Sequence, residues 1–189
     1  MTEKGSTRNL IKDTLVKMMG DTAFYKIKVS DLCKQAYISR NMFYAQFDSI
    51  FSVLEELEDG FFAGLIDEKE MILSHMDEAF YQEKSLLWSL FTAKYVVENA
   101  EVCKALLGPN GDADFQNRVM QRCNKIIDKT LGNSGIAPLE KRIACEFLAN
   151  GFIGLLRDNL ANNAKNPSED LYEWVLVSRK IVNRCLDLE

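Results

Sequence analysis

Residues 29–47 read V-S-D-L-C-K-Q-A-Y-I-S-R-N-M-F-Y-A-Q-F and predict two short helices joined by one tight turn. In the first helix, apolar side chains recur at helical spacing and would contact a small core, namely Val29, Leu32, Cys33 and Ala36. Ser39 is a suitable N-cap for the second helix, because its hydroxyl can accept a hydrogen bond from a free backbone N–H. Phe43 and Phe47 lie four residues apart, on a face that we expect to be buried.

The opposite face of the second helix carries side chains that suit a DNA duplex. Arg40 offers a planar fork of donors for guanine or phosphate, and Asn41 can pair with the edge of an adenine. Tyr44 can donate its hydroxyl to a phosphate, and Met42 can touch a thymine methyl. This pattern is typical of a DNA-reading helix-turn-helix. The alternative is a helical hairpin that caps a larger core and carries ordinary solvated polar residues.

The composition indicates a globular protein. A chain of 189 residues that is 47% hydrophobic can bury the core of one domain or of two small ones. No apolar run approaches the roughly 20 residues of a membrane span, and no signal peptide is evident, so we expect a cytoplasmic location and no membrane contact. The cysteines are scattered and lie in apolar patterns, which predicts buried thiols rather than disulfides; they are Cys33, Cys103, Cys123, Cys145 and Cys185.

Charge is distributed unevenly along the chain. The first 50 residues carry eight Lys and Arg against five Asp and Glu, whereas the whole chain has a net charge of −5. A basic end on an acidic body favours DNA contact at that end alone, since neutralised phosphates supply most of the non-specific affinity. The scatter of charge on an ordinary solvated surface is the alternative.

Helical patterns continue through the rest of the chain and predict an all-α fold. No run alternates as a strand would, and most glycines gather in turns such as residues 108–111 and 132–135. The expected helices cover about residues 6–20, 50–65, 68–80, 84–107, 112–131, 138–164 and 168–188.

The last two of these helices carry long apolar stripes, and we expect them to pack against a second copy of the chain. Gly151 and Gly154 interrupt one stripe, at a cost in helix stability that a close helix approach would offset. The residues assigned to this interface are Phe152, Leu155, Leu156, Trp174, Val175 and Ile181.

Aromatic and sulfur-bearing residues in the body could line an apolar ligand pocket, although such residues more often form a core. The pocket candidates are Phe62, Met76, Trp88, Phe91, Tyr95, Met120 and Phe147.

The sequence gives no support for an enzyme. His75 is the only histidine, so one chain cannot build a histidine-based metal cluster, and a structural role is the simpler interpretation. There is no C-x-x-C, G-x-G-x-x-G or P-loop spacing. We therefore expect no catalytic residues, no metal and no cofactor.

Residues 6–57 resemble the DNA-binding domain of the TetR (tetracycline-repressor) family of bacterial transcriptional regulators. The resemblance lies in K-V-S-D-L-C-K-Q-A-Y-I-S followed by R-N-M-F-Y-A-Q-F, in which Tyr44 and Phe47 occupy the family's Y-x-x-F positions. The later segments E-N-A-E-V-C-K-A-L-L-G-P-N-G-D and G-F-I-G-L-L are similar to a C-terminal type found among such regulators. By this resemblance the DNA contacts are Lys28, Ser39, Arg40, Asn41, Met42, Tyr44 and Gln46.

The resemblance also implies an organisation. A three-helix DNA-binding domain, residues 1–50, would precede a larger helical regulatory and dimerisation domain, residues 51–189. The protein would be a homodimeric repressor on a palindromic operator in double-stranded DNA, and a small-molecule inducer in the helical body would modulate it. The alternative is a protein-interaction co-regulator of the same fold whose DNA binding is weakened or lost.

Two positions depart from the family pattern. Tyr37 replaces the usual glycine of the turn, which is unfavourable if that position needs a left-handed backbone and could otherwise change the turn. Ile50 replaces a lysine that meets a phosphate, so one charge-assisted contact is expected to be missing. Lys28 and Arg8 are the candidates to compensate for it.

Overall fold

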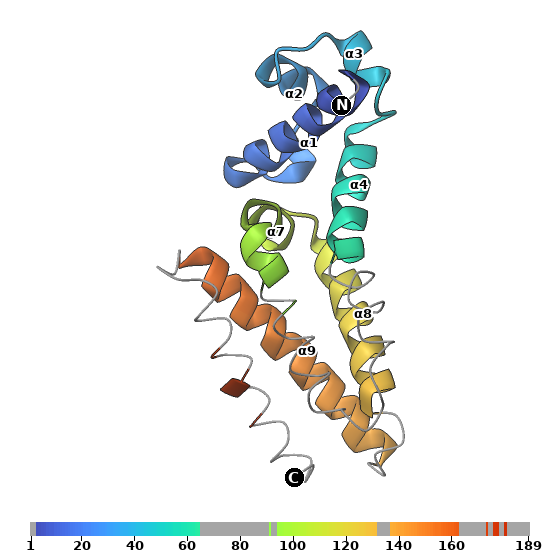
Figure 1. Ribbon diagram of the computed structural model, residues 1–189, viewed down its shortest axis with the longest axis vertical. Helices are drawn as coiled ribbons and strands as arrows, with labels where there is room; N and C mark the ends of the chain where they lie inside the picture. Colours follow the sequence, from blue (N-terminus) through green and yellow to red (C-terminus); the bar gives the residue numbers. More distant parts are fainter. Residues whose placement is uncertain are drawn as a thin grey trace. The chain divides into compact units, whose positions relative to one another are not determined.

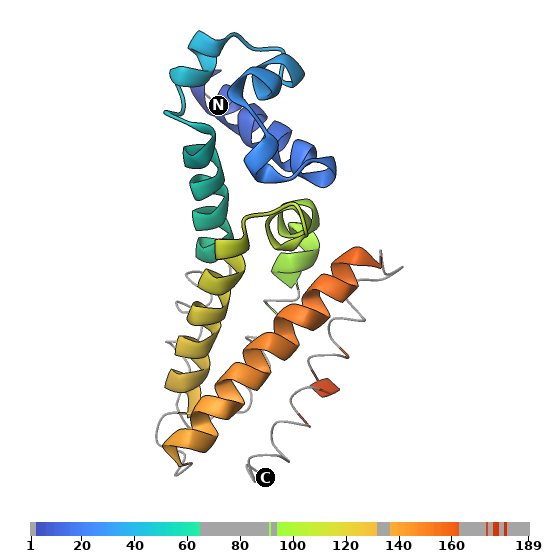
Figure 2. The same ribbon diagram turned by 180° about the vertical axis from the view of Figure 1, so that it is seen from behind.

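The structure is a computed structural model, and it describes residues 3–64, 91, 94–131, 137–162, 173, 176–177 and 180 (Figures 1 and 2). Across these ranges the regular elements are helices and no strand occurs, which confirms the all-α class. The chain forms two compact units: Met1–Glu70 with Asn99–Asp112, and Met71–Glu98 with Ala113–Glu189. No helix in the described part is long and apolar enough to cross a membrane.

The first unit is built around its first helix. Its elements are α1 (Glu3–Asp21), η1 (Phe24–Lys26), α2 (Val29–Gln35), α3 (Arg40–Tyr44), α4 (Ile50–Phe62) and α7 (Ala100–Leu107). Helix α1 packs against α2, α4 and α7 and buries Ile11, Leu15 and Met19 almost completely. Burial of such side chains is the main favourable term for this small unit, at about 1.5–3 kcal/mol each.

Helix α4 begins with two serines that cap each other. The Ser49 hydroxyl accepts a hydrogen bond from the Ser52 backbone N–H at 3.1 Å, and the Ser52 hydroxyl accepts one from the Ser49 backbone N–H at 3.1 Å. This reciprocal capping box satisfies N–H groups that a helix start leaves free. It fixes Ile50 as the first residue of α4, with only 8% of its surface exposed.

The turn after α7 is hydrogen-bonded to residues at and just after the end of α1. The Phe24 backbone N–H donates to the Asn110 carbonyl at 2.8 Å, and Asn110 Nδ2 donates to the Gly20 carbonyl at 3.2 Å. Helix α7 thereby belongs to the same unit as the N-terminal helices, far along the sequence from them.

The second unit contains α8 (Ala113–Leu131) and α9 (Pro138–Ala161), which pack on each other and run in opposite directions (Figures 1 and 2). Pro138 begins α9, where its fixed φ suits a helix and its missing N–H is not needed. Asn124 Nδ2 on α8 donates to Glu146 Oε1 on α9 at 3.1 Å. Ile153, Leu156 and Leu160 are buried apolar residues in the later part of α9.

Several expected boundaries differ from the structure. The expected start of the first helix at Ser6 is wrong, since α1 begins at Glu3 and continues through Gly20. The helix expected over residues 84–107 is interrupted at Asn99, whose φ of −116° and ψ of 30° are not helical, and α7 begins afterwards. The compact units do not divide at residue 50, because α4 and α7 pack with α1, and the functional division at that residue stays a prediction. The helices expected over residues 68–80 and 168–188 lie outside the described residues or are described at a few positions only.

Candidate DNA-contact surface

Helix α2 ends in a turn with a defined hydrogen-bond pattern. The Ile38 N–H donates to the Cys33 carbonyl at 3.0 Å, and the Tyr37 N–H donates to the Lys34 carbonyl at 3.3 Å. This pair of bonds is a Schellman motif, which requires a left-handed residue directly after the C-cap. Tyr37 holds that position with a φ of 54°, so the turn keeps the left-handed geometry although it lacks the glycine.

Helix α3 begins at the predicted N-cap. Ser39 has an extended backbone, and its Oγ accepts a hydrogen bond from the Met42 N–H at 3.2 Å. Phe43 is fully buried and Phe47 is 4% exposed, with ring centroids 6.2 Å apart. The Tyr44 ring meets Phe43 edge to face at 5.4 Å. These contacts fix the orientation of a helix that is too short to be stable by itself.

The other side of α3 is exposed, as the sequence predicted. Arg40 and Asn41 are exposed, while Met42 and Tyr44 retain 46% and 55% of their surface. The N-cap of α2, Lys28, is exposed as well, and Gln46 is half-buried. The predicted DNA-contact residues other than Lys28 therefore lie in one run, from the N-cap of α3 to just past its end.

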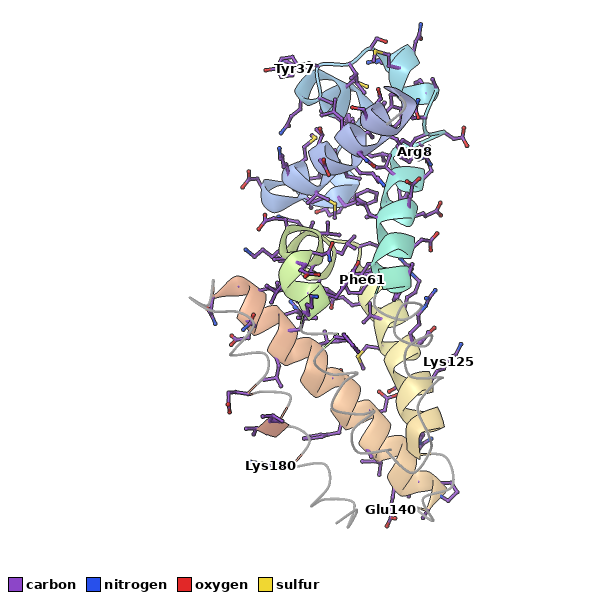
Figure 3. All side chains as sticks on the ribbon, viewed as in Figure 1. Arg8, Tyr37, Phe61, Lys125, Glu140 and Lys180 are labelled. Atoms are coloured by element: carbon purple, nitrogen blue, oxygen red, sulfur yellow. The ribbon has the colours of Figure 1, made fainter. Side chains whose placement is uncertain are left out.

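Arg8 on α1 holds the end of this run in place (Figure 3). Arg8 Nε donates to Glu56 Oε1 at 3.1 Å and to Oε2 at 2.8 Å, and its Nη1 donates to the Gln46 carbonyl. The guanidinium carbon lies 4.0 Å from the centroid of the Phe47 ring, within cation–π range. Arg8 thus connects α1, the residues after α3, and α4.

The same contacts govern the ionisation of the carboxylate. The hydrogen bond from Arg8 has the largest effect on the pKa of Glu56 and lowers it, while burial acts in the opposite direction. Lys12, whose Nζ lies 3.1 Å from Glu56 Oε1, lowers the pKa further. In return, the hydrogen bond to Glu56 raises the pKa of Arg8. The Arg8 guanidinium is paired with Glu56 while 40% of its side chain stays exposed, so the expectation that Arg8 compensates for the missing lysine stays a prediction. Ile50 itself is buried at the start of α4.

Two of the predicted thiols are buried as expected. Burial raises the pKa of Cys33, although Arg40 acts in the opposite direction, and burial raises the pKa of Cys103 to about 12. Both remain protonated at neutral pH and are poor nucleophiles. Among the described residues no group of His, Cys, Asp and Glu is arranged to hold a metal ion, and His75 lies outside them.

The pocket candidates differ in how deeply they are buried. Phe62 is buried on α4, whereas Phe91, Tyr95 and Met120 are half-buried. Phe147 on α9 is 72% exposed, so the structure places it at the surface rather than in the interior expected for a pocket residue. Helix α9 carries apolar residues on several faces, and their spacing alone could not show which face is buried. Met76 and Trp88 lie outside the described residues.

The dimerisation candidates also differ in burial. Leu156 is 3% exposed and packs within its own chain, contrary to the expectation that it faces a partner, while Leu155 is 36% exposed. Phe152 lies within α9. Trp174, Val175 and Ile181 lie outside the described residues.

Sequence reasoning missed the positioning role of Arg8 and Glu56. They are 48 residues apart, and periodicity within one helix gives no information about which residue of another helix an arginine meets. The full exposure of Tyr37, at 96%, was also not anticipated.

Comparison with known proteins identifies the type of the C-terminal region and the fold. Residues 86–176 match a TetR-type family model described as "Transcriptional regulator C-terminal region". A search of curated protein sequences finds no match.

Solved structures share the fold over almost the whole chain. The fatty acid degradation regulator FadR from Bacillus halodurans is 16% identical, with a TM-score of 0.72 and 96% of each chain covered. The dihydroxyacetone kinase operon activator DhaS is 20% identical, with a TM-score of 0.61 and coverage of 96% of this chain and 97% of that one. Thermus thermophilus FadR, a transcriptional repressor in complex with lauroyl-CoA, is 17% identical, with a TM-score of 0.59 and coverage of 93% and 92%.

Proposed function

Because the chain belongs to the TetR family of transcriptional regulators, we propose that it is a homodimeric regulator that binds a palindromic DNA operator through α3. The observation that carries this proposal is the two-sided character of α3. Phe43 and Phe47 anchor it in the core, and Arg40, Asn41 and Tyr44 remain exposed on the other side. A helix held by one face with donors and acceptors on the other is suited to read base edges in the major groove.

Each exposed side chain has a chemically distinct role in this proposal. Arg40 and Asn41, at the first turn of α3, read bases, and Met42 contacts a thymine methyl. Tyr44 takes part in reading, and its hydroxyl can also reach a phosphate. Lys28, Ser39 and Gln46 position the first unit on phosphates. The Ser39 oxygen already accepts a bond from the Met42 N–H, which leaves its hydroxyl hydrogen free to donate to a phosphate.

Dimerisation is supported by the exposed apolar side chains of α9. Leu139, Ile143, Phe147 and Leu155 recur at intervals of four or eight residues and retain between 36% and 72% of their surface. Side chains four apart form a ridge that fits the groove of a facing helix. Phe152 and the residues assigned beyond α9, Trp174, Val175 and Ile181, complete the proposed interface. A two-fold dimer then places two copies of α3 on half-sites about one helical turn apart.

A small molecule in the helical body is proposed to modulate operator binding. The likeness to a repressor solved with lauroyl-CoA supports an apolar ligand. The remaining pocket candidates are Phe62, Met76, Trp88, Phe91, Tyr95 and Met120. The ligand would act by binding more tightly to the conformation that does not fit the operator, which makes the protein a cytoplasmic repressor released by its inducer.

One observation favours the alternative of a protein-interaction co-regulator. The first residue of α4 is the buried Ile50, which cannot supply the phosphate contact that a lysine would make there. In this alternative the apolar ridge of α9 binds another protein and α3 does not read DNA.

Selection from a random-sequence duplex library distinguishes the two. Purified full-length protein is expected to enrich an inverted repeat with half-sites about one helical turn apart, and light scattering is expected to give the mass of a dimer. If no sequence is enriched over several rounds, the result would contradict the proposal of a DNA-binding regulator and favour the co-regulator.

A further inference from the structure

Tyr37 occupies a backbone conformation that is unfavourable for its residue type. Its φ of 54° is left-handed, where the Cβ of an L-residue crowds the following carbonyl oxygen and where glycine is the usual choice. The Schellman bonds from Tyr37 and Ile38 fix this geometry, so the strain belongs to the turn itself.

The Tyr37 side chain does not offset that strain by burial against the described residues of the unit. Tyr37 is 96% exposed, so its ring buries almost no apolar surface. Tyr44, by comparison, is 55% exposed and packs against Phe43. A strained residue whose side chain does not stabilise its own fold points to a function outside that fold.

The position of the side chain indicates what it meets. Tyr37 projects outward from the turn between α2 and α3, three residues before Arg40 (Figure 3). When a recognition helix enters the major groove, the preceding helix crosses the sugar-phosphate backbone, so the turn between them lies at the groove edge. Tyrosine hydroxyls are common donors to phosphate oxygens at such edges.

We propose that the Tyr37 hydroxyl donates a hydrogen bond to an operator phosphate beside the half-site that α3 reads. This inference rests on the proposed function. The Tyr37 contact would partly replace the phosphate contact that the buried Ile50 cannot make. The tyrosine hydroxyl is uncharged, so the contact positions the first unit on the DNA without releasing an additional counterion.

The test uses the operator obtained by selection and four variants of the full chain. Tyr37→Phe removes only the hydroxyl, while Tyr37→Gly removes the side chain and relieves the left-handed strain. Tyr25→Phe is the matched control, because Tyr25 is 78% exposed in the same unit but lies on η1, at the opposite end of α1 from α3 (Figure 1). Arg40→Ala reports on the proposed function itself.

Operator affinity, its salt dependence and thermal unfolding are measured for each variant. We expect Tyr37→Phe to weaken operator binding about tenfold with an unchanged salt slope, and Tyr25→Phe to leave binding unchanged. Tyr37→Gly should bind as weakly as Tyr37→Phe yet unfold roughly 2–4 °C higher, because the strain is gone.

Two results would overturn the proposal in distinguishable ways. If Arg40→Ala weakens operator binding while Tyr37→Phe and Tyr37→Gly bind like the wild type, Tyr37 makes no phosphate contact and the proposed function stands. If the wild type itself shows no preference for any DNA sequence, both the proposed function and the role of Tyr37 fail.

Discussion

Arg8 on α1 and Glu56 on α4, 48 positions apart in the sequence, form an ion pair in which Arg8 Nε lies 3.1 and 2.8 Å from the two carboxylate oxygens. The same guanidinium donates to the Gln46 carbonyl and lies over Phe47. The pair therefore sets the angle at which the chain leaves α3 and enters α4. Its partial exposure, 40% for Arg8 and 30% for Glu56, moderates its contribution to stability.

Glu56→Gln is expected to lower the free energy of unfolding by about 1 kcal/mol, a value already reduced for solvent screening. It should also weaken operator binding, because Arg8 loses the partner that holds it beside Gln46. Urea unfolding followed by circular dichroism measures the first effect. Glu101→Gln is the control, since the Glu101–Lys104 pair on α7 is largely exposed and its loss should leave stability unchanged. Equal effects of the two substitutions would contradict the positioning role of Arg8.

The contribution of Glu56 should depend on pH in one direction. Its pKa is lower in the folded chain than in the unfolded chain, so the stabilisation is fully present above the ordinary glutamate pKa of about 4.3. It is lost as the pH falls through the lowered folded pKa. The difference in stability between wild type and Glu56→Gln should therefore be constant near neutrality and shrink below about pH 4. A difference that grows on acidification would be inconsistent with this pairing.

Gly111 and Gly20 should respond to alanine with opposite signs. A Cβ at Gly111 would lie 2.3 Å from the Leu106 carbonyl oxygen and 2.8 Å from that of Ala105, and these backbone atoms cannot move aside cheaply. Gly111→Ala should therefore displace the turn that holds Asn110 against α1 and lower stability by about 1–3 kcal/mol. A Cβ at Gly20 would meet no atom within 4 Å, and Gly20 lies in α1, so Gly20→Ala should stabilise by about 0.5–1 kcal/mol. Thermal unfolding of both variants, and exchange of the Phe24 amide hydrogen in Gly111→Ala, check these values.

Substitutions of Phe147 and Leu156, both on α9, should affect dimerisation and folding stability separately. Phe147→Glu changes an exposed side chain, so α9 should remain folded. The dimer should become weaker and dissociate at a higher protein concentration than the wild type, as measured by sedimentation. Leu156→Ala removes a buried side chain and should cost about 2–5 kcal/mol of folding stability. An unchanged dimer in Phe147→Glu would exclude the α9 ridge from the interface.

Cys33 and Cys103 should resist thiol reagents until the protein unfolds. Both thiols are buried, and the pKa of Cys103 is about 12, so almost no thiolate exists at pH 8. Alkylation with and without denaturant, mapped by mass spectrometry, is expected to modify them only in denaturant. Rapid labelling in the native protein would show that the cores around α2 and α7 open readily.

Local sequence signals predicted the helix-turn-helix well. The four-residue spacing of Phe43 and Phe47 and the hydroxyl of Ser39 each determine structure within a few residues, and both appear as expected. The left-handed backbone of Tyr37 did not follow from the sequence, because the glycine that favours this conformation is missing there.

Contacts between distant segments could not be predicted in this way. Arg8 was interpreted as a free cation because no local pattern identifies Glu56 as its partner. On α9 the apolar residues occupy more than one face, so spacing gave no basis for placing Leu156 inside and Phe147 outside. Which face is buried depends on α8, and that information resides in the three-dimensional packing.

The central claim, that α3 reads DNA sequence, is tested most directly by fluorescence anisotropy of wild type and Arg40→Ala against the selected operator and a scrambled duplex over a salt series. The wild type is expected to prefer the operator, and Arg40→Ala to lose about 1–3 kcal/mol of that preference with its fold intact by circular dichroism. Equal binding of the two duplexes by wild type, or an unchanged preference in Arg40→Ala, would contradict the claim.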